Sequence, residues 1–203
     1  MADDVLVVVA LGDSLTAGYR TVDPYALDPR VPYPAQLMTL INGRLKGQTQ
    51  AFVINAGING DDTNGMLWRF RQTVAIEKPE IVVIWGGIND LGAAKEPEQV
   101  MENITKLYDL CRETGATPVA CTLTPTRLTS TKIRRLNELI RAYASEKDLV
   151  LVDLFSGLVD VEGNLRQEYS DDGVHLTQAG YRRIAEIVLG AIVPLIERWS
   201  SDQ

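Results

Sequence analysis

A serine, a histidine and an aspartate in this sequence have the types and spacing of a hydrolytic site. Ser14 follows the first apolar stretch, and His175 is the only histidine of the chain. A serine hydroxyl is a weak nucleophile that needs a base, and histidine is the usual base at neutral pH. Asp172 stands three residues before His175, so a turn brings its carboxylate to the imidazole Nδ1–H. We expect His175 to fold back onto Ser14, with Ser14, Asp172 and His175 as the catalytic residues of acyl transfer.

Acyl transfer also needs hydrogen-bond donors for the tetrahedral oxyanion, and three candidates follow apolar stretches. They are the backbone N–H of Ser14, the backbone N–H of Gly60 and the side-chain amide of Asn89. Glycine allows a close backbone approach to a substrate, and asparagine carries a neutral donor that aspartate lacks. One such donor contributes about 3 kcal/mol to transition-state stabilisation. We expect Ser14, Gly60 and Asn89 to form the oxyanion hole.

Five apolar runs must position these residues, and they are typical of buried parallel strands. They cover residues 5–11, 51–55, 81–85, 118–123 and 149–152. Helical patterns alternate with them: one over residues 34–45, one capped by Thr63, one between Pro97 and Gly115, one over 133–143 and one opened by Thr177. This alternation predicts an α/β fold with a five-stranded parallel sheet and helices on both faces. Ligands of such sheets bind beyond the carboxyl ends of the strands.

Each of these short signals also has an ordinary structural interpretation. Ser14 is equally typical of a helix N-cap, and Asn59-Gly60 of a turn. Asn89 would serve as a helix cap, and His175 as a structural histidine. The hydrolytic interpretation depends on their conjunction, because four separate strand-end segments supply complementary parts of one mechanism.

Composition excludes several other classes of protein. The 203 residues contain 45% hydrophobic and 23% charged residues, which are ordinary globular values. We expect a single domain over residues 1–203. The formal net charge of −7 disfavours nucleic acid and anionic membranes as partners. Two cysteines and one histidine make neither a disulfide framework nor a usual zinc site.

The start of the chain is acidic and lacks the features of a secretory signal. We therefore expect a cytoplasmic protein, although a mature secreted form without its leader would have the same start. The longest later apolar stretch is too short to span a bilayer, so we expect no integral membrane segment.

Four ordered blocks resemble those of the GDSL, or SGNH, hydrolase family. Residues 12–15, Gly-Asp-Ser-Leu, are similar to the first block, and residues 55–61 to the second, whose functional glycine falls on Gly60. Residues 87–90, Gly-Ile-Asn-Asp, are similar to the third block. Residues 172–175, Asp-Gly-Val-His, are similar to the fifth. Together the blocks span nearly the whole chain.

The resemblance implies a flavodoxin-like three-layer α/β/α sandwich and a metal-free, cofactor-free esterase, lipase or thioesterase acting on small-molecule esters. It distinguishes the chain from α/β-hydrolases with a G-x-S-x-G elbow, because Thr16 stands where that motif has glycine. Asp13, Tyr33, Thr124 and Val174 are expected to line the substrate site, Asp13 by shaping the nucleophile turn.

Two further features leave their roles open. Residues 19–33 form a long segment with three tyrosines and three prolines, either a semi-rigid lip over the site or a surface loop with buried tyrosines. Arg127 would meet an anionic substrate group, although a solvated or ion-paired arginine is the more common case.

Three alternatives to a short- to medium-chain acyl esterase are a carbohydrate O-acetylesterase, a non-catalytic binding module and a flavodoxin- or receiver-like regulator that uses Asp13. The sequence leaves acyl-chain length, leaving group and oligomeric state open.

Overall fold

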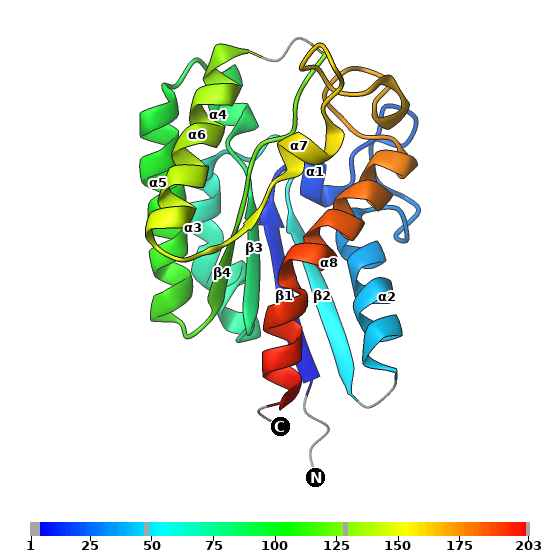
Figure 1. Cartoon of the computed structure of the whole chain (residues 1–203), viewed down its shortest axis with the longest axis vertical. Helices are drawn as coiled ribbons and strands as arrows, with labels where there is room; N and C mark the ends of the chain where they lie inside the picture. The colour runs from blue at the N-terminus through cyan, green and yellow to red at the C-terminus, as the bar shows by residue number, and fades with distance from the viewer. Residues whose placement is uncertain (1–4, 47–48, 128–129, 202–203) are drawn as a thin grey trace.

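Five parallel strands form one sheet at the centre of the molecule (Figure 1). The computed structural model describes residues 5–46, 49–127 and 130–201. Strand order is β2-β1-β3-β4-β5, as in flavodoxin-like sheets. The strands are β1 (Val5–Gly12), β2 (Gln50–Gly57), β3 (Ile81–Trp85), β4 (Thr117–Cys121) and β5 (Val150–Val152). The five-stranded parallel sheet predicted from the apolar runs is confirmed.

Helices cover both faces of the sheet, which makes a three-layer sandwich (Figure 1). On one face α2 (Tyr33–Leu45) packs against α8 (Gln178–Ser201). On the other, α5 (Pro97–Glu113) packs between α3 (Thr63–Thr73) and α6 (Thr131–Glu146). Within the described part of the chain, no helix is long and apolar enough to cross a membrane.

Short helices lie at the carboxyl ends of three strands, β1, β3 and β5. They are α1 (Ser14–Ala17), α4 (Ile88–Gly92) and α7 (Leu154–Leu158). Two 3₁₀ turns lie elsewhere, over Ala75–Glu77 before β3 and over Gln167–Tyr169 before the Asp172 turn. Figure 1 shows α1 and α7 at the same end of the sheet. Of the residues predicted to do chemistry, Ser14 lies in α1 and Asn89 in α4.

Local sequence explains where the long helices begin. Pro97 occupies the first turn of α5 after a capping box formed by Glu96 and Gln99, as its fixed φ favours. Thr177 precedes α8, and its hydroxyl accepts a hydrogen bond from the Gly180 N–H. The prediction that Thr63 caps α3 is wrong: Asp62 is the N-cap, and its carboxylate accepts from the Gly65 N–H.

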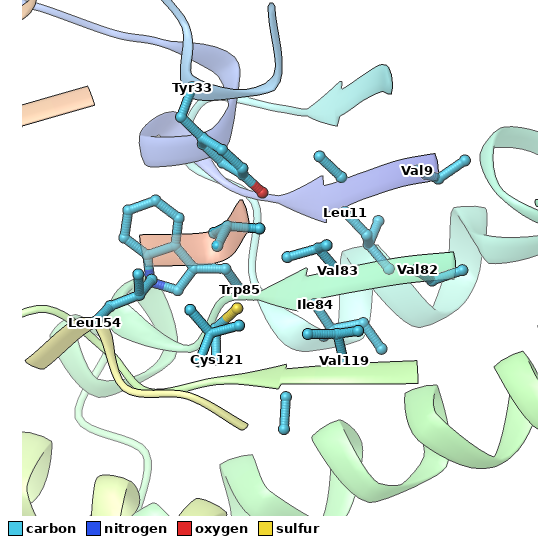
Figure 2. Close-up of a cluster of buried hydrophobic side chains, with 14 of the residues drawn as sticks. Val9, Leu11, Tyr33, Val82, Val83, Ile84, Trp85, Val119, Cys121 and Leu154 are labelled. Atoms are coloured by element: carbon cyan, nitrogen blue, oxygen red, sulfur yellow. The ribbon is translucent and has the colours of Figure 1, made fainter. Parts of the chain in front are cut away.

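The core lies on both faces of the central strands and explains the continuous apolar runs. Val82 and Val83 point to opposite faces of β3, and both are fully buried. Figure 2 shows Trp85 and Tyr33 packed beside this cluster at the carboxyl end. Each buried Val or Ile side chain contributes about 1.5–3 kcal/mol, so the sheet is a rigid support for the segments that follow its strands.

Strand β3 matches its predicted range, and the boundaries of the other four strands differ from the predicted ones by one or two residues. Strand β2 extends from Gln50 to Gly57 rather than over residues 51–55, because its pairing with β1 begins at Gln50 and continues through Ala56 and Gly57. Strand β4 ends at Cys121 rather than at residue 123. Hydropathy does not report pairing, so these ends could not be predicted from apolar runs.

Candidate active site

The sheet order brings three of the predicted segments to one edge. Strand β1 lies between β2 and β3, and Gly12 at its end is paired with both Gly57 and Trp85. The segment containing Ser14 therefore leaves the sheet between the segment containing Gly60 and the one containing Asn89. An acyl carbon bound beside Ser14 would therefore lie close to the two candidate oxyanion donors on the neighbouring segments, as acyl transfer requires.

Ser14 is the first residue of helix α1 and is 6% exposed. Asp13 caps this helix, because its carboxylate accepts a hydrogen bond of 2.9 Å from the Leu15 N–H. The turn also needs glycine at position 12, since a Cβ there would lie 2.2 Å from Thr16 Oγ1 and 2.5 Å from the Trp85 carbonyl oxygen. Glycine and the buried cap together fix the direction in which Ser14 leaves β1.

Asp172 and His175 form a compact turn before α8. One carboxylate oxygen of Asp172 accepts hydrogen bonds of 2.8 Å from the N–H groups of Val174 and His175. Its other oxygen lies 2.7 Å from Nδ1 of His175. Partial burial alone would raise the pKa of Asp172, but the His175 ring and these N–H groups hold that pKa below its usual value.

The His175 ring reaches back to the start of the chain. Its Nε2 atom lies 3.2 Å from the Ser14 Oγ atom, across 161 sequence positions. Tyr19 packs against the ring with a centroid separation of 4.3 Å, and its carbonyl oxygen accepts a 2.6 Å hydrogen bond from the Tyr181 hydroxyl. The imidazole is thus held between a carboxylate, a hydroxyl and an aromatic face.

The two remaining oxyanion candidates occupy neighbouring segments. Gly60 has a φ of +77°, a left-handed conformation that favours glycine, in a turn closed by the Asp61 N–H and the Ile58 carbonyl. The Asn89 amide donates one hydrogen bond of 2.8 Å to the main-chain oxygen of Asp61. An amide nitrogen carries two hydrogens, so this bond orients Asn89 and leaves a second donor.

Two of the residues predicted to line the substrate site are buried in this structure. Asp13 is 1% exposed and Tyr33 is 0% exposed, so neither side chain presents a surface to substrate. Burial, followed by the nearby charges of Asp61 and Asp90, raises the pKa of Asp13 to about 7 despite the bond from Leu15. Tyr33 lies in the core beside Trp85, as Figure 2 shows. A buried Asp13 also argues against the regulator alternative.

The other two predicted substrate contacts stay predictions. Thr124 is buried at 4% exposure after β4. Val174 is half-buried, and its N–H is bound to Asp172.

Residues 19–33 bury one tyrosine in the core and expose three large apolar side chains, and the role of this segment stays a prediction. Tyr33 is buried, whereas Val22, Tyr25 and Leu27 are 76%, 83% and 79% exposed. Asp23 holds the backbone in place by accepting hydrogen bonds from the Arg20 side chain and the Leu27 N–H. The segment is therefore an ordered loop with an apolar outer surface, connected through Tyr19 to the His175 ring.

Arg127 contacts the turn that carries Asp172 and His175. Its N–H donates a 2.7 Å hydrogen bond to the Gly173 carbonyl, and its guanidinium donates to the Asp171 carbonyl at 2.9 Å. This position favours the ordinary structural interpretation of Arg127 over an anion site. The adjacent residues 128–129 lie outside the described part of the chain.

Sequence reasoning missed three residues beneath the site. Ser170 donates a 2.6 Å hydrogen bond to the His175 carbonyl and accepts one from the Gly173 N–H. Asp61 supplies the acceptor for Asn89, and Arg69 binds the Asp61 carboxylate. A signal existed for Arg69 alone: it stands between Met66 and Phe70 on the apolar stripe of a predicted helix, where a charge is unusual.

Across the described residues, no group of three or more His, Cys, Asp or Glu side chains is arranged to hold a metal ion. The side chains available for chemistry are the hydrogen-bonded row of Ser14, His175 and Asp172, with amide and backbone donors around it.

The fold and this arrangement define an α/β/α hydrolase whose serine follows the first strand. Comparisons with known proteins agree. The GDSL-like Lipase/Acylhydrolase family model matches residues 10–183, and the chain belongs to this family.

Two relatives and one solved structure that the chain resembles are named as thioesterase, esterase or acylhydrolase. The chain is 29% identical over 199 residues to the thioesterase 1/protease 1/lysophospholipase L1 of Escherichia coli strain K12, covering 96% of this chain and 86% of that protein. It is 30% identical over 146 residues to the esterase TesA of Pseudomonas aeruginosa, covering 71% of each. The crystal structure of the lipase/acylhydrolase from Enterococcus faecalis matches with a TM-score of 0.74 and 26% identity, covering 92% of this chain and 95% of that one.

Proposed function

We propose that this protein hydrolyses esters or thioesters of short- to medium-chain acyl groups, lysophospholipids included, through an acyl-enzyme on Ser14. The observation that carries the proposal is the continuous row from the Ser14 hydroxyl to the His175 ring and the Asp172 carboxylate, at 3.2 Å and 2.7 Å. Both distances are within reach of proton transfer in a loosely aligned free enzyme.

In the first half-reaction Ser14 Oγ forms a bond to the acyl carbon while its proton moves to Nε2 of His175. The ionised Asp172 stabilises the resulting imidazolium and fixes the tautomer through Nδ1. The Ser14 N–H, the Gly60 N–H and the free hydrogen of the Asn89 amide bind the oxyanion. The bond to the leaving group then breaks, and the alcohol or thiol takes the proton from Nε2.

In the second half-reaction water attacks the acyl-enzyme. His175 removes a proton from the water as it adds to the carbonyl carbon, and the same oxyanion donors bind the second tetrahedral intermediate. Its collapse breaks the bond to Ser14 Oγ, which regains a proton from His175. The products are the carboxylic acid and the unchanged enzyme.

The apolar outer surface of residues 19–33 supports an acyl group of some length as the substrate. Val22, Tyr25 and Leu27 expose large apolar surfaces on the loop that Tyr19 connects to His175, and exposed apolar patches commonly mark binding surfaces. The relative from Escherichia coli is named as a thioesterase and lysophospholipase. A carbohydrate O-acetylesterase remains the alternative, which a panel of acyl esters and acetylated sugars separates.

The catalytic roles are tested by replacing Ser14 and His175 in the full chain. We expect Ser14→Ala and His175→Ala each to reduce the kcat for p-nitrophenyl butyrate by at least about 10³-fold. The first variant loses the attacking hydroxyl, and the second loses the base that accepts its proton. Ser200→Ala, on the exposed end of α8, is the matched control and should keep wild-type kcat. Circular dichroism establishes that the variants are folded. Wild-type activity in either catalytic variant would contradict the assignment.

A further inference from the structure

A buried arginine lies beneath the candidate site. Arg69 on α3 is only 6% exposed, between Met66 and Phe70, which are fully buried. A guanidinium so far from water is tolerated only when its donors are bound to acceptors. The partners of Arg69 therefore indicate what it holds in place.

The guanidinium of Arg69 joins two strand-end segments. Its Nε donates a 2.7 Å hydrogen bond to the Asp61 carboxylate in the loop after β2. Its Nη2 donates a 3.0 Å hydrogen bond to the carbonyl oxygen of Gly12, at the end of β1. The same carbonyl accepts a hydrogen bond from the Ile58 N–H. The rigid, planar fork of an arginine fixes the distance between its two acceptors.

Both acceptors lie next to proposed catalytic groups. Gly12 stands two residues before Ser14, and Asp61 directly follows Gly60. The main-chain oxygen of Asp61 also binds the Asn89 amide at 2.8 Å. The position of Asp61 thus determines both the Gly60 turn and the orientation of Asn89, and Arg69 ties Asp61 to the segment of the nucleophile.

We propose that Arg69 is the positioning residue of the oxyanion hole, which holds the donors of Gly60 and Asn89 in register with Ser14. It contacts no substrate and acts through Asp61 and Gly12. The inference rests on the proposed function. Its physical basis is that oxyanion donors stabilise a transition state only when they are preorganised, and small displacements reduce the rate by orders of magnitude.

A second ion pair holds the adjacent backbone independently of Arg69. The buried Asp90 carboxylate accepts from the N–H and hydroxyl of Thr63 and from Lys95, and Lys95 also binds Asp62. These contacts join the start of α3 to the residue after Asn89. A change at Arg69 should therefore displace the Asp61 turn while α3 keeps its place.

The test compares three variants of the full chain with wild type. Arg69→Lys keeps the charge but removes the fork that binds two acceptors. The double variant Asp61→Asn/Arg69→Gln removes both buried charges together, so that neither is left unpaired if the lysine variant fails to fold. Arg71→Gln, on the exposed side of the same helix, is the matched control. Circular dichroism and urea unfolding establish which variants are folded at the assay temperature.

We expect the kcat for p-nitrophenyl butyrate to fall by about 10- to 100-fold in the folded Arg69 variants, with KM within about twofold of wild type. Inhibition by an alkyl trifluoromethyl ketone, whose adduct places an oxyanion among these donors, should weaken in proportion to kcat/KM. If Arg69 only stabilised the fold, its replacement would lower the urea midpoint and leave both kcat and the inhibition by the ketone unchanged.

Two results would overturn the proposal: kcat within about twofold of wild type in the folded variants, or a loss confined to KM. Ser14→Ala in the same assay separates the two claims. If Ser14→Ala keeps its activity, the proposed function fails; if it is inactive while the Arg69 variants are fully active, only the role of Arg69 fails.

Discussion

Asp172 binds its own turn with one carboxylate oxygen and the His175 ring with the other. The N–H groups of Val174 and His175 fix the carboxylate, and the carboxylate in turn fixes the ring so that Nε2 faces Ser14. Ser170 supports the same turn through the His175 carbonyl. The imidazole orientation is therefore set by these six consecutive residues together with the Tyr19 ring, and does not depend on the substrate.

Replacing Asp172 by asparagine should lower activity without dismantling the turn. The asparagine oxygen can still accept from the two N–H groups, but its amide cannot accept the Nδ1–H, so the required tautomer is lost. We expect kcat to fall by about 10²- to 10⁴-fold, and by less than in Ser14→Ala. Steady-state kinetics with p-nitrophenyl butyrate measures kcat for Asp172→Asn and for Ser14→Ala. A rate equal to wild type would remove Asp172 from the proposed triad.

Asp13 should make stability depend on pH. Its pKa is about 7 in the folded protein against 3.8 for an ordinary aspartate, so folding favours the protonated form. The stabilising contribution is complete below the unfolded pKa and is lost as pH rises through the folded one. Asp13→Asn keeps a cap acceptor for Leu15 and removes the titration.

We therefore expect wild type to lose up to about 4 kcal/mol of unfolding free energy relative to Asp13→Asn between roughly pH 4 and pH 8. Urea unfolding at intervals of pH measures the difference. Asp109→Asn, on the exposed side of α5, is the control. Parallel pH curves for wild type and Asp13→Asn would show that Asp13 does not titrate in this range.

At the scale of elements, the loop over residues 19–33 connects the His175 ring to an apolar surface. Its charges are paired within the loop, Arg20 with Asp23 and Arg30 with Asp28. The exposed Val22, Tyr25 and Leu27 are thus presented on an ordered, locally neutral backbone. Such a surface suits an acyl chain better than the hydroxyl groups of a sugar.

The triple variant Val22→Ser/Tyr25→Ser/Leu27→Ser should change acyl-chain preference. We expect KM for a p-nitrophenyl decanoate to rise by about tenfold, because apolar contact area is lost, while KM for the acetate stays within about twofold. Ile76→Ser, exposed near the amino end of β3, is the control. An equal change in KM for the decanoate and the acetate would exclude this loop from acyl-chain recognition.

The sequence allowed prediction of the long elements and of the row of Ser14, Asp172 and His175, because apolar periodicity and motif spacing are local properties. It did not show that Tyr33, predicted at the substrate site, lies in the core. It did not reveal that Asn89 is oriented by the main-chain oxygen of Asp61. Every residue type carries a main-chain oxygen, so the sequence does not indicate which one accepts this hydrogen bond, and only the fold shows it.

At the scale of the whole molecule, strand order explains how the site is assembled. The β2-β1-β3 arrangement places the segment of Ser14 between the segments of Gly60 and Asn89. The turn before α8 places His175 at the same end of the sheet as Ser14, from which it is separated by 161 positions in the sequence. Because the sheet is held by a continuous buried core, the proposed catalytic groups are positioned before any substrate binds, as transition-state stabilisation requires.

The central claim is that His175 activates Ser14 as a nucleophile, and covalent labelling tests it most directly. The folded full-length protein is treated with a fluorophosphonate, and the modified residue is located by peptide mass spectrometry. We predict one adduct, on Ser14, in wild type, none in Ser14→Ala, and labelling slowed by at least about 10²-fold in His175→Ala. Unlabelled wild-type protein, or an adduct on a different residue, would contradict the account.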